Sequence, residues 1–307
     1  MEIANLLNAL PGAIGQGLIW GIMAIGVFIT YKILDIADLT VDGTLATGGA
    51  VCIMMLRADY PIWTALLFAF AAGLLAGLIS GLLHTAMGIP ALLAGILTQY
   101  ALWSVNLQIL AGANQSISVD KYALLISSRF VTEAIGIVAI FAVIIIALLY
   151  WFFGTSLGCG IRASGANPNM SRAQGINVNL NKIIGLMLSN GLVALSGGLL
   201  AQYQGFADVK MGIGSIVIGL AAVIIGETIF GRIFKNFALR LLGVVLGAII
   251  YYVVLQTISW FGIDSDFQKL LTAVIVAIFL AISYWKGRLF RPSKRYVTAK
   301  STEKEEA

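Results

Sequence analysis

Charged side chains are scarce in this sequence. Asp, Glu, Lys and Arg make up 11% of its 307 residues, whereas a soluble domain carries about 25%. Hydrophobic residues reach 60%, and the mean hydropathy is +0.96. The scarcity excludes an ordinary soluble enzyme, and we expect no nucleic-acid partner. We predict an all-α, polytopic membrane helix bundle with one transmembrane domain at residues 1–288 and a short tail at residues 289–307.

Histidine and cysteine are almost absent, with one His and two Cys in the chain. Cys52 lies in an apolar segment and Cys159 in a polar one, which argues against a disulfide. So few ligands form no metal cluster. The sequence also lacks a GxxxxGK(S/T) phosphate loop, so it cannot bind ATP in that manner, and it lacks Ser–His–Asp and HExxH arrangements. We therefore expect no catalytic residue, metal or cofactor in this chain.

Apolar segments of membrane-spanning length fill most of the sequence. A helix needs about 20 mostly apolar residues to cross a bilayer. Because Met1 and Glu2 open the chain without a basic region, we expect the first helix to be retained rather than cleaved. We predict about nine transmembrane helices, at residues 11–31, 38–57, 62–84, 87–110, 130–153, 182–203, 212–231, 237–260 and 268–288.

Basic residues predict the orientation, because cytoplasmic loops are enriched in Lys and Arg. Most of the 19 basic residues fall on one side of the membrane if the central polar segment, residues 154–182, is cytoplasmic. This choice places the N-terminus outside and the C-terminus inside. We interpret the basic and acidic tail as an anchor that faces anionic lipid or, alternatively, as a regulatory site.

The central segment, residues 154–182, is the longest polar interruption of the sequence, and it contains the signals of a short helix. Asn167 is a favourable N-cap, and Pro168 follows at the first helical position, where its missing N–H costs nothing. Gly175 can adopt the left-handed conformation that ends a helix. We therefore predict a helix over Pro168–Gln174.

The second predicted span opens with the polar stretch ADLTVDGTLATGGA. Thr40, Thr44 and Thr47 recur at helical spacing and lie on one stripe. Ionisable groups inside a membrane are costly and usually face a bundle interior or a watery path, so we predict that the stripe and Asp42 line a substrate pathway. Alternatively, Asp38 is an N-cap and both carboxylates favour the positive end of their own helix.

Other polar side chains inside the predicted spans support a polar axis. Gln99, Asn106 and Asn190 are further pathway candidates together, although hydrogen bonding between helices is the favoured explanation for each one taken singly. Glu227 lies near the cytoplasmic end of the seventh span. It is a candidate gate residue, or a partner of the nearby Arg232.

Three stretches resemble one protein family. They are GLIWGIMAIGVFITYKILDIADLTVDGTLATGGAV at 17–51, GIPALLAGIL at 88–97 and RASGANPNMSRAQGINVNLNKIIGLMLSNGLVALSGGLLAQYQG at 162–205. The chain resembles branched-chain amino-acid-type permeases of ATP-binding cassette (ABC) importers. In these permeases the second span usually begins with an Asn-Phe-Ala-His-Gly-type run. Here it reads Asp-Leu-Thr-Val-Asp-Gly, which is similar to a subgroup linked with tryptophan or tyrosine uptake.

The resemblance implies a permease subunit for an amino acid, aromatic or branched-chain, or a similar small solute. It implies two separate ATPase subunits that bind the ATP, a second permease copy, identical or different, and an extracytoplasmic solute-binding protein. The location would be the plasma (inner) membrane of a prokaryote, in contact with lipid. The central helix would be the coupling helix that docks on the ATPase. The coupling residues would be Arg162, Asn167, Pro168, Asn169, Met170, Ser171, Arg172, Gln174 and Gly175.

Two other functions fit the residues alone. An ion- or proton-coupled secondary transporter would use Asp42 and Glu227 to carry a small solute without ATP. A scaffold subunit with no transport path would have the same hydrophobic composition. Copurification of an ATPase separates the importer from both alternatives.

Overall fold

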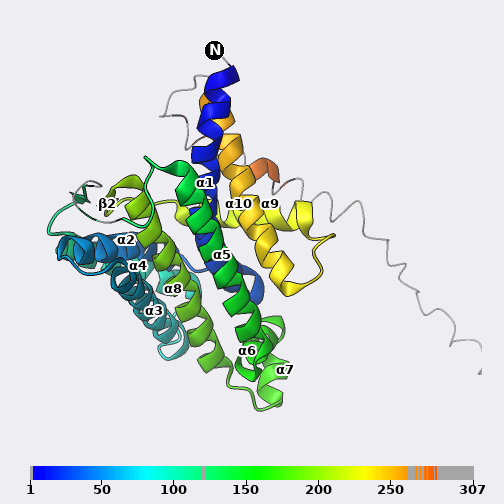
Figure 1. Ribbon diagram of the computed structural model, residues 1–307. Helices are drawn as coiled ribbons and strands as arrows, with labels where there is room; N and C mark the ends of the chain where they lie inside the picture. The colour runs from blue at the N-terminus through cyan, green and yellow to red at the C-terminus, as the bar shows by residue number, and fades with distance from the viewer. Residues whose placement is uncertain are drawn as a thin grey trace, which may run out of the picture.

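The fold is given by a computed structural model, which describes residues 3–118, 122, 124–260 and isolated positions between 267 and 281. Helices make up most of the described chain (Figure 1). They are α1 Ile3–Phe28, the π-helical turn η1 Ile29–Ile33, α2 Thr40–Arg57, α3 Ile62–Thr85, α4 Ala91–Leu110, α5 Val131–Gly154, α6 Ser156–Ala166, α7 Pro168–Ala173, α8 Val178–Gln204, α9 Ser215–Phe230 and α10 Phe237–Trp260.

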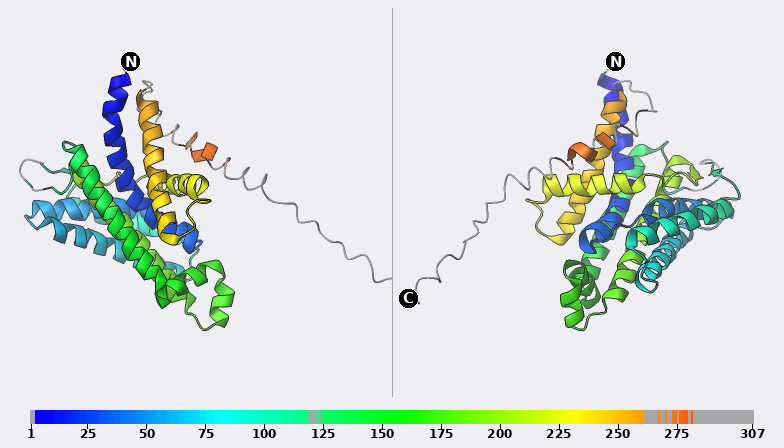
Figure 2. Two further views of the ribbon diagram at one scale, coloured as in Figure 1. Left: turned by 45° about the vertical axis from the view of Figure 1, so that its right-hand side comes forward. Right: turned by 180° about the vertical axis from the view of Figure 1, so that it is seen from behind.

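Helices lie at the first eight predicted spans. Within the described residues, five segments are long and apolar enough to cross a membrane: Asn8–Ile33, Ile62–Thr85, Val131–Gly154, Val178–Gln204 and Phe237–Trp260. Helix α9 has 16 residues, and at 1.5 Å per residue it is shorter than a full span. It runs across α1 and α10 rather than along them (Figure 2). The ninth predicted span falls on residues described only at isolated positions, so the count of nine and the orientation stay predictions.

Helix α8 packs against α1, α2 and α3. Two of its serines donate hydrogen bonds to α1: Ser189 Oγ to the Gly26 carbonyl and Ser196 Oγ to the Ile19 carbonyl, each at 2.7 Å. A Cβ atom at Gly48 of α2 would collide with the α8 backbone. Small residues and serines of this kind let membrane helices approach closely, so α8 is held tightly inside the bundle.

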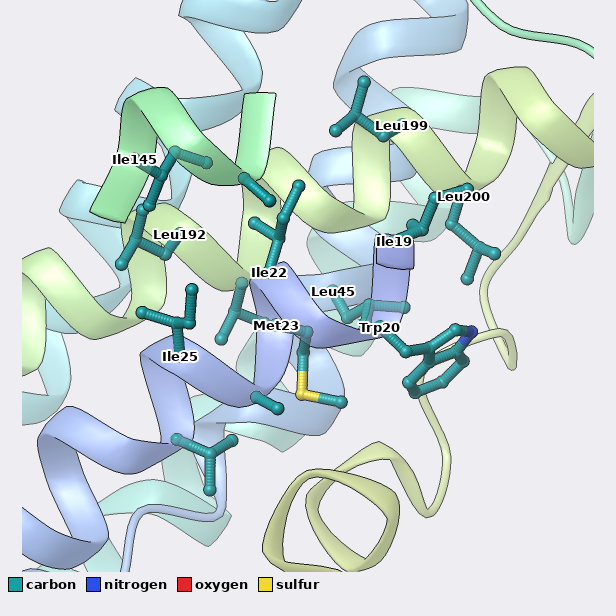
Figure 3. Packing of buried hydrophobic residues seen from close by; sticks show 14 of the residues in the cluster. Ile19, Trp20, Ile22, Met23, Ile25, Leu45, Ile145, Leu192, Leu199 and Leu200 are labelled. Atoms are coloured by element: carbon teal, nitrogen blue, oxygen red, sulfur yellow. The ribbon is translucent and has the colours of Figure 1, made fainter. Parts of the chain in front are cut away.

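The core is formed by apolar side chains from four helices (Figure 3). Ile19 and Ile22 of α1 meet Leu45 of α2, Leu192 of α8 and Ile145 of α5, and all five are buried. Because lipid tails are as apolar as these side chains, close van der Waals contact is what favours their packing.

Two connections complete the fold. Gly88 has φ +69° and turns the chain between α3 and α4, which confirms the predicted separation of these helices. The short strands β1 Asn114–Ser116 and β2 Phe206–Asp208 pair antiparallel, with Asn114 opposite Asp208. This sheet, which the prediction of an all-α fold missed, lies away from α6 and α7 (Figure 1).

Candidate functional site

The central polar segment folds into two helices, α6 and α7. Asn167 caps α7 by accepting a hydrogen bond from the Met170 amide at 3.0 Å, and Gly175 has φ +76°. Both predicted helix signals are confirmed, although α7 ends at Ala173 and Gln174 is its C-cap. The sequence analysis missed α6. The signal that could have revealed it is Thr155, whose hydroxyl caps α6 by accepting from the Gly158 amide.

Most residues of α7 are exposed. Asn169, Met170 and Arg172 are exposed, and Met170 is 61% exposed although it is apolar. Ser171 is 3% exposed, and its carbonyl accepts from the Ile176 amide at 3.0 Å. Ser171 therefore anchors α7 to the following turn, and it is the buried member of the predicted coupling residues. Asn169, Met170 and Arg172 belong to the accessible part of the helix.

Helix α6 attaches α7 to the membrane-length helices. Asn181 of α8 donates to Ser164 Oγ at 2.9 Å, and the Arg162 guanidinium lies 5.5 Å from the ring centre of Phe237. Gly165 faces the Ile33 carbonyl of η1 so closely that a Cβ atom would not fit. A displacement of α6 therefore reaches η1 directly.

Glu227 forms an ion pair with Lys32. The Lys32 Nζ atom lies 2.9 Å from Glu227 Oε2, with the two side chains 48% and 29% exposed. Lys32 was not predicted as the partner of Glu227, because the pair joins segments far apart in the chain, whereas Arg232 is near in sequence. The pair links η1 to the last turns of α9.

Asp42 caps a helix, but not its own. One of its carboxylate oxygens accepts from Ser215 Oγ and the Ile216 amide, and the other accepts from the Gly214 amide, each at 2.9 Å. These donors form the N-terminus of α9. A carboxylate is favoured at the positive end of a helix, so Asp42 joins α2 to α9. Asp42 also lies in the first turn of α2, so the alternative in which it favours the positive end of its own helix is compatible with this contact.

A buried polar network connects the start of α2 to α8. Asn190 donates to Asp38 Oδ2 at 2.7 Å and accepts from Thr44 Oγ1 at 2.8 Å. Asp38 Oδ1 accepts from the Thr40 amide at 3.0 Å, but the N-cap of α2 is Leu39, so Asp38 is not the N-cap that the sequence suggested. Thr40 Oγ1 in turn donates to Ser80 of α3 at 2.9 Å. Asp38 was not among the predicted site residues, although it is 2% exposed and lies at the centre of this network.

The remaining pathway candidates gather on the α4 side of α2. Thr47 Oγ1 donates to the Gly43 carbonyl at 2.9 Å, and Asn106 Nδ2 approaches the same carbonyl at 3.4 Å. Gln99 of α4 is half-buried, and its backbone lies next to Gly43 of α2. Asn106 Oδ1 is buried with no hydrogen-bond partner in the described chain. The predicted pathway residues therefore surround α2, but they do not share one face of it.

The structure combines apolar helices of membrane length with buried polar side chains between them, and an exposed capped helix lies at one end. This combination is typical of multi-pass membrane permeases. The chain belongs to the family described as branched-chain amino acid transport system / permease component, which matches residues 10–282. Members of this family are transport subunits of ABC transporters, not catalytic enzymes.

Known proteins are similar over most of the chain. The chain is 36% identical to a tyrosine transport system permease protein of Clostridioides difficile (strain R20291), over 90% of this chain and 91% of that protein. It is 26% identical to the ribose import permease protein RbsC of Escherichia coli (strain K12), over 90% and 84%. A solved structure described as PsaBC from Streptococcus pneumoniae in complex with Fab has a TM-score of 0.51 and 16% identity, over 96% and 98%. That last likeness shows the fold alone.

Proposed function

We propose that this chain is the permease subunit of an ABC importer in a prokaryotic plasma membrane, and that its solute is an amino acid, aromatic or branched-chain. The observation that carries the substrate class is the 36% identity with a tyrosine permease over 90% of this chain. The ribose permease is more distant, at 26%. An aromatic amino acid such as tyrosine is the first solute to test.

The exposed surface of α7 is the proposed contact with the ATPase subunits, which bind and hydrolyse the ATP. Helix α7 exposes a Met and an Arg, which suits docking, because protein interfaces are enriched in both residue types. Asn167, Pro168 and Gly175 fix the shape of this helix, since they supply its cap, its first residue and its left-handed end. Asn169, Met170, Arg172 and Gln174 supply the contacts.

A chain of contacts supports a route from α7 to α2. Helix α6 touches η1 at Gly165 and Ile33. Lys32 of η1 pairs with Glu227 of α9, and the other end of α9 is capped by Asp42 of α2. Because α9 is joined to η1 at one end and to α2 at the other, an ATPase closure that displaces α6 and η1 would carry α9 with it and so shift α2.

We place the solute path along α2 and its polar neighbours. The amide and carboxylate groups of the buried network can exchange their internal hydrogen bonds for bonds to an amino-acid solute. A second permease copy and an extracytoplasmic solute-binding protein complete the assembly. The strand pair β1–β2, which lies away from α7, is the proposed docking side for the binding protein.

The secondary-transporter alternative receives less support. It needs Asp42 and Glu227 as ion or proton carriers, yet Asp42 accepts hydrogen bonds from three donors and Glu227 is paired with Lys32. Carboxylates with these fixed partners are more simply explained as contacts that join two helices than as carriers of an ion or proton.

Purification of the tagged chain from its native membrane tests the proposal. We expect an ATPase to copurify in near-equal amount and to hydrolyse ATP faster when the binding protein and tyrosine are added. Arg172→Glu should abolish that stimulation, whereas Asn179→Gln, an exposed change at the start of α8, should not. Equal stimulation in both variants would remove α7 from the coupling mechanism.

A further inference from the structure

A cavity of about 610 Å³ lies where α5 ends, beside α6 and the start of α10. Two cationic side chains line it, Arg162 from α6 and Lys235 from the residues just before α10. Asn236 lines it as well and adds an amide donor. No acidic side chain is among the lining residues, and neither cation forms an ion pair within the part of the chain that the structure describes. The cavity therefore has uncompensated positive charge.

Aromatic side chains form the other wall of the cavity. Tyr150 and Trp151 line it from the last turn of α5, and they are 50% and 70% exposed. Tyr and Trp are enriched at the boundary between the acyl region and the headgroups of a membrane. Their position on an apolar helix of membrane length puts the cavity at headgroup depth.

An exposed apolar stripe on α5 leads to this cavity. Ile140, Ile144 and Leu148 are 62%, 51% and 60% exposed, and their spacing continues to Trp151 on the same face of the helix. Helix α5 descends to α6 (Figure 1). A hydrocarbon chain can lie against the stripe while the polar group at its end reaches the two cations.

From this arrangement we infer that the cavity is a binding site for the headgroup of an anionic phospholipid, with one acyl chain lying along the α5 stripe. The guanidinium of Arg162 binds the phosphate oxygens through its fork of N–H donors, and the Lys235 ammonium adds a second charge. Basic pockets between membrane helices recognise anionic headgroups in this way. The inference does not depend on the transported solute or on the ATPase.

The stacking of Arg162 gives the site a structural consequence. Its guanidinium lies over the Phe237 ring at 5.5 Å, and Phe237 is the first residue of α10. A lipid phosphate on Arg162 and Lys235 would bridge α6 to the start of α10, next to the end of α5. The lipid would therefore stabilise the attachment of α6, the helix that carries α7.

Lipid retention by the full-length protein tests the site. The protein is reconstituted in vesicles of equimolar phosphatidylcholine and phosphatidylglycerol, extracted in mild detergent, and its retained lipid is counted by native mass spectrometry. We expect phosphatidylglycerol to be retained in preference to phosphatidylcholine. Arg162→Gln and Lys235→Gln should each reduce that retention about fivefold, as expected for the loss of one charge near anionic lipid. Arg172→Gln, an exposed cation outside the cavity, should leave it unchanged.

Two further arms keep the test decisive. Arg162→Lys and Lys235→Arg preserve the charge and should retain phosphatidylglycerol, which separates loss of binding from loss of folding. Lys235→Gln changes an exposed residue and should elute from size-exclusion chromatography like the wild type. Equal retention by wild type and both Gln variants would overturn the inference. Displacement of the lipid by inorganic phosphate at equal concentration would also overturn it, because the cavity would then be a soluble-anion site.

Discussion

The Lys32 ammonium on η1 lies 2.9 Å from a carboxylate oxygen of Glu227 on α9. The pair is partly exposed, so its contribution to stability is small, about 0.2–1 kcal/mol. Its position is more informative than its energy. It joins the turn that touches α6 to the helix that is capped by Asp42, so it lies midway along the proposed route from α7 to α2.

The first prediction concerns this pair. Glu227→Gln should lower ATP-dependent uptake severalfold while leaving the melting temperature nearly unchanged, because the pair transmits motion more than it stabilises the fold. The charge-swapped double variant Lys32→Glu with Glu227→Lys should recover much of the uptake. Failure of the swap to recover any activity, with both proteins well folded, would count against the pair as a joint.

The second prediction concerns Asp42. Asp42→Ala leaves the Gly214, Ser215 and Ile216 donors without their acceptor, and loss of a helix cap costs about 0.5–2 kcal/mol. We expect a lower melting temperature and weaker uptake. Asp35→Asn is the matched control, because Asp35 is exposed at φ 55° and Asn tolerates that conformation. An unchanged melting temperature in Asp42→Ala would contradict the capping role.

The third prediction concerns Asn190. Asn190→Ala removes a donor from the buried Asp38 carboxylate, and the loss costs about 1–3 kcal/mol, whereas the Thr44 hydroxyl can still donate to the Thr40 carbonyl. Asn190→Asp should be worse, since two carboxylates would then meet where the amide donates at 2.7 Å. Thermal unfolding in detergent measures both changes, with Asn179→Ala, exposed on the same helix, as the control. Equal melting temperatures for Asn190→Ala and Asn190→Asp would contradict a clash between two carboxylates at this position.

The fourth prediction concerns the contact of α6 with η1. Gly165→Val should force the two backbones apart, because even a Cβ atom has no room beside the Ile33 carbonyl. We expect stimulated ATPase activity to fall sharply while the ATPase still copurifies, since α7 itself is unchanged. Gly136→Val is the control, because no neighbouring atom lies within 4 Å of a Cβ there. Full stimulation in Gly165→Val would remove this contact from the route.

The sequence predicted the features that depend on local rules. Asn167, Pro168 and Gly175 fix α7 within a few residues of chain, so its position could be predicted without knowledge of the fold. The length of the apolar segments likewise located the helices, because an apolar segment long enough to cross a membrane forms few structures other than a helix. Helix α9 is the exception. Its apolar run satisfied the length rule, but the structured residues after β2 leave only 16 residues in the helix.

The joints between helices could not be predicted, because each one depends on packing between distant segments. Asp42 was expected at its own helix terminus, yet its three donors lie more than 170 positions further along the chain. Glu227 was compared only with nearby Arg232. The small residues of α2 and α8 indicated close packing but not which turns would meet, so the threonine stripe could not be assigned to one neighbour.

The central claim is that this chain moves its solute only with an ATPase that acts through α7. The most direct test is uptake of radiolabelled tyrosine into vesicles that contain this chain with or without its copurifying ATPase, with the binding protein added outside and ATP inside. We predict that uptake requires both the ATPase and ATP, and that Arg172→Glu abolishes it. Uptake by this chain alone, driven by an ion or proton gradient and unaffected by ATP, would contradict the account.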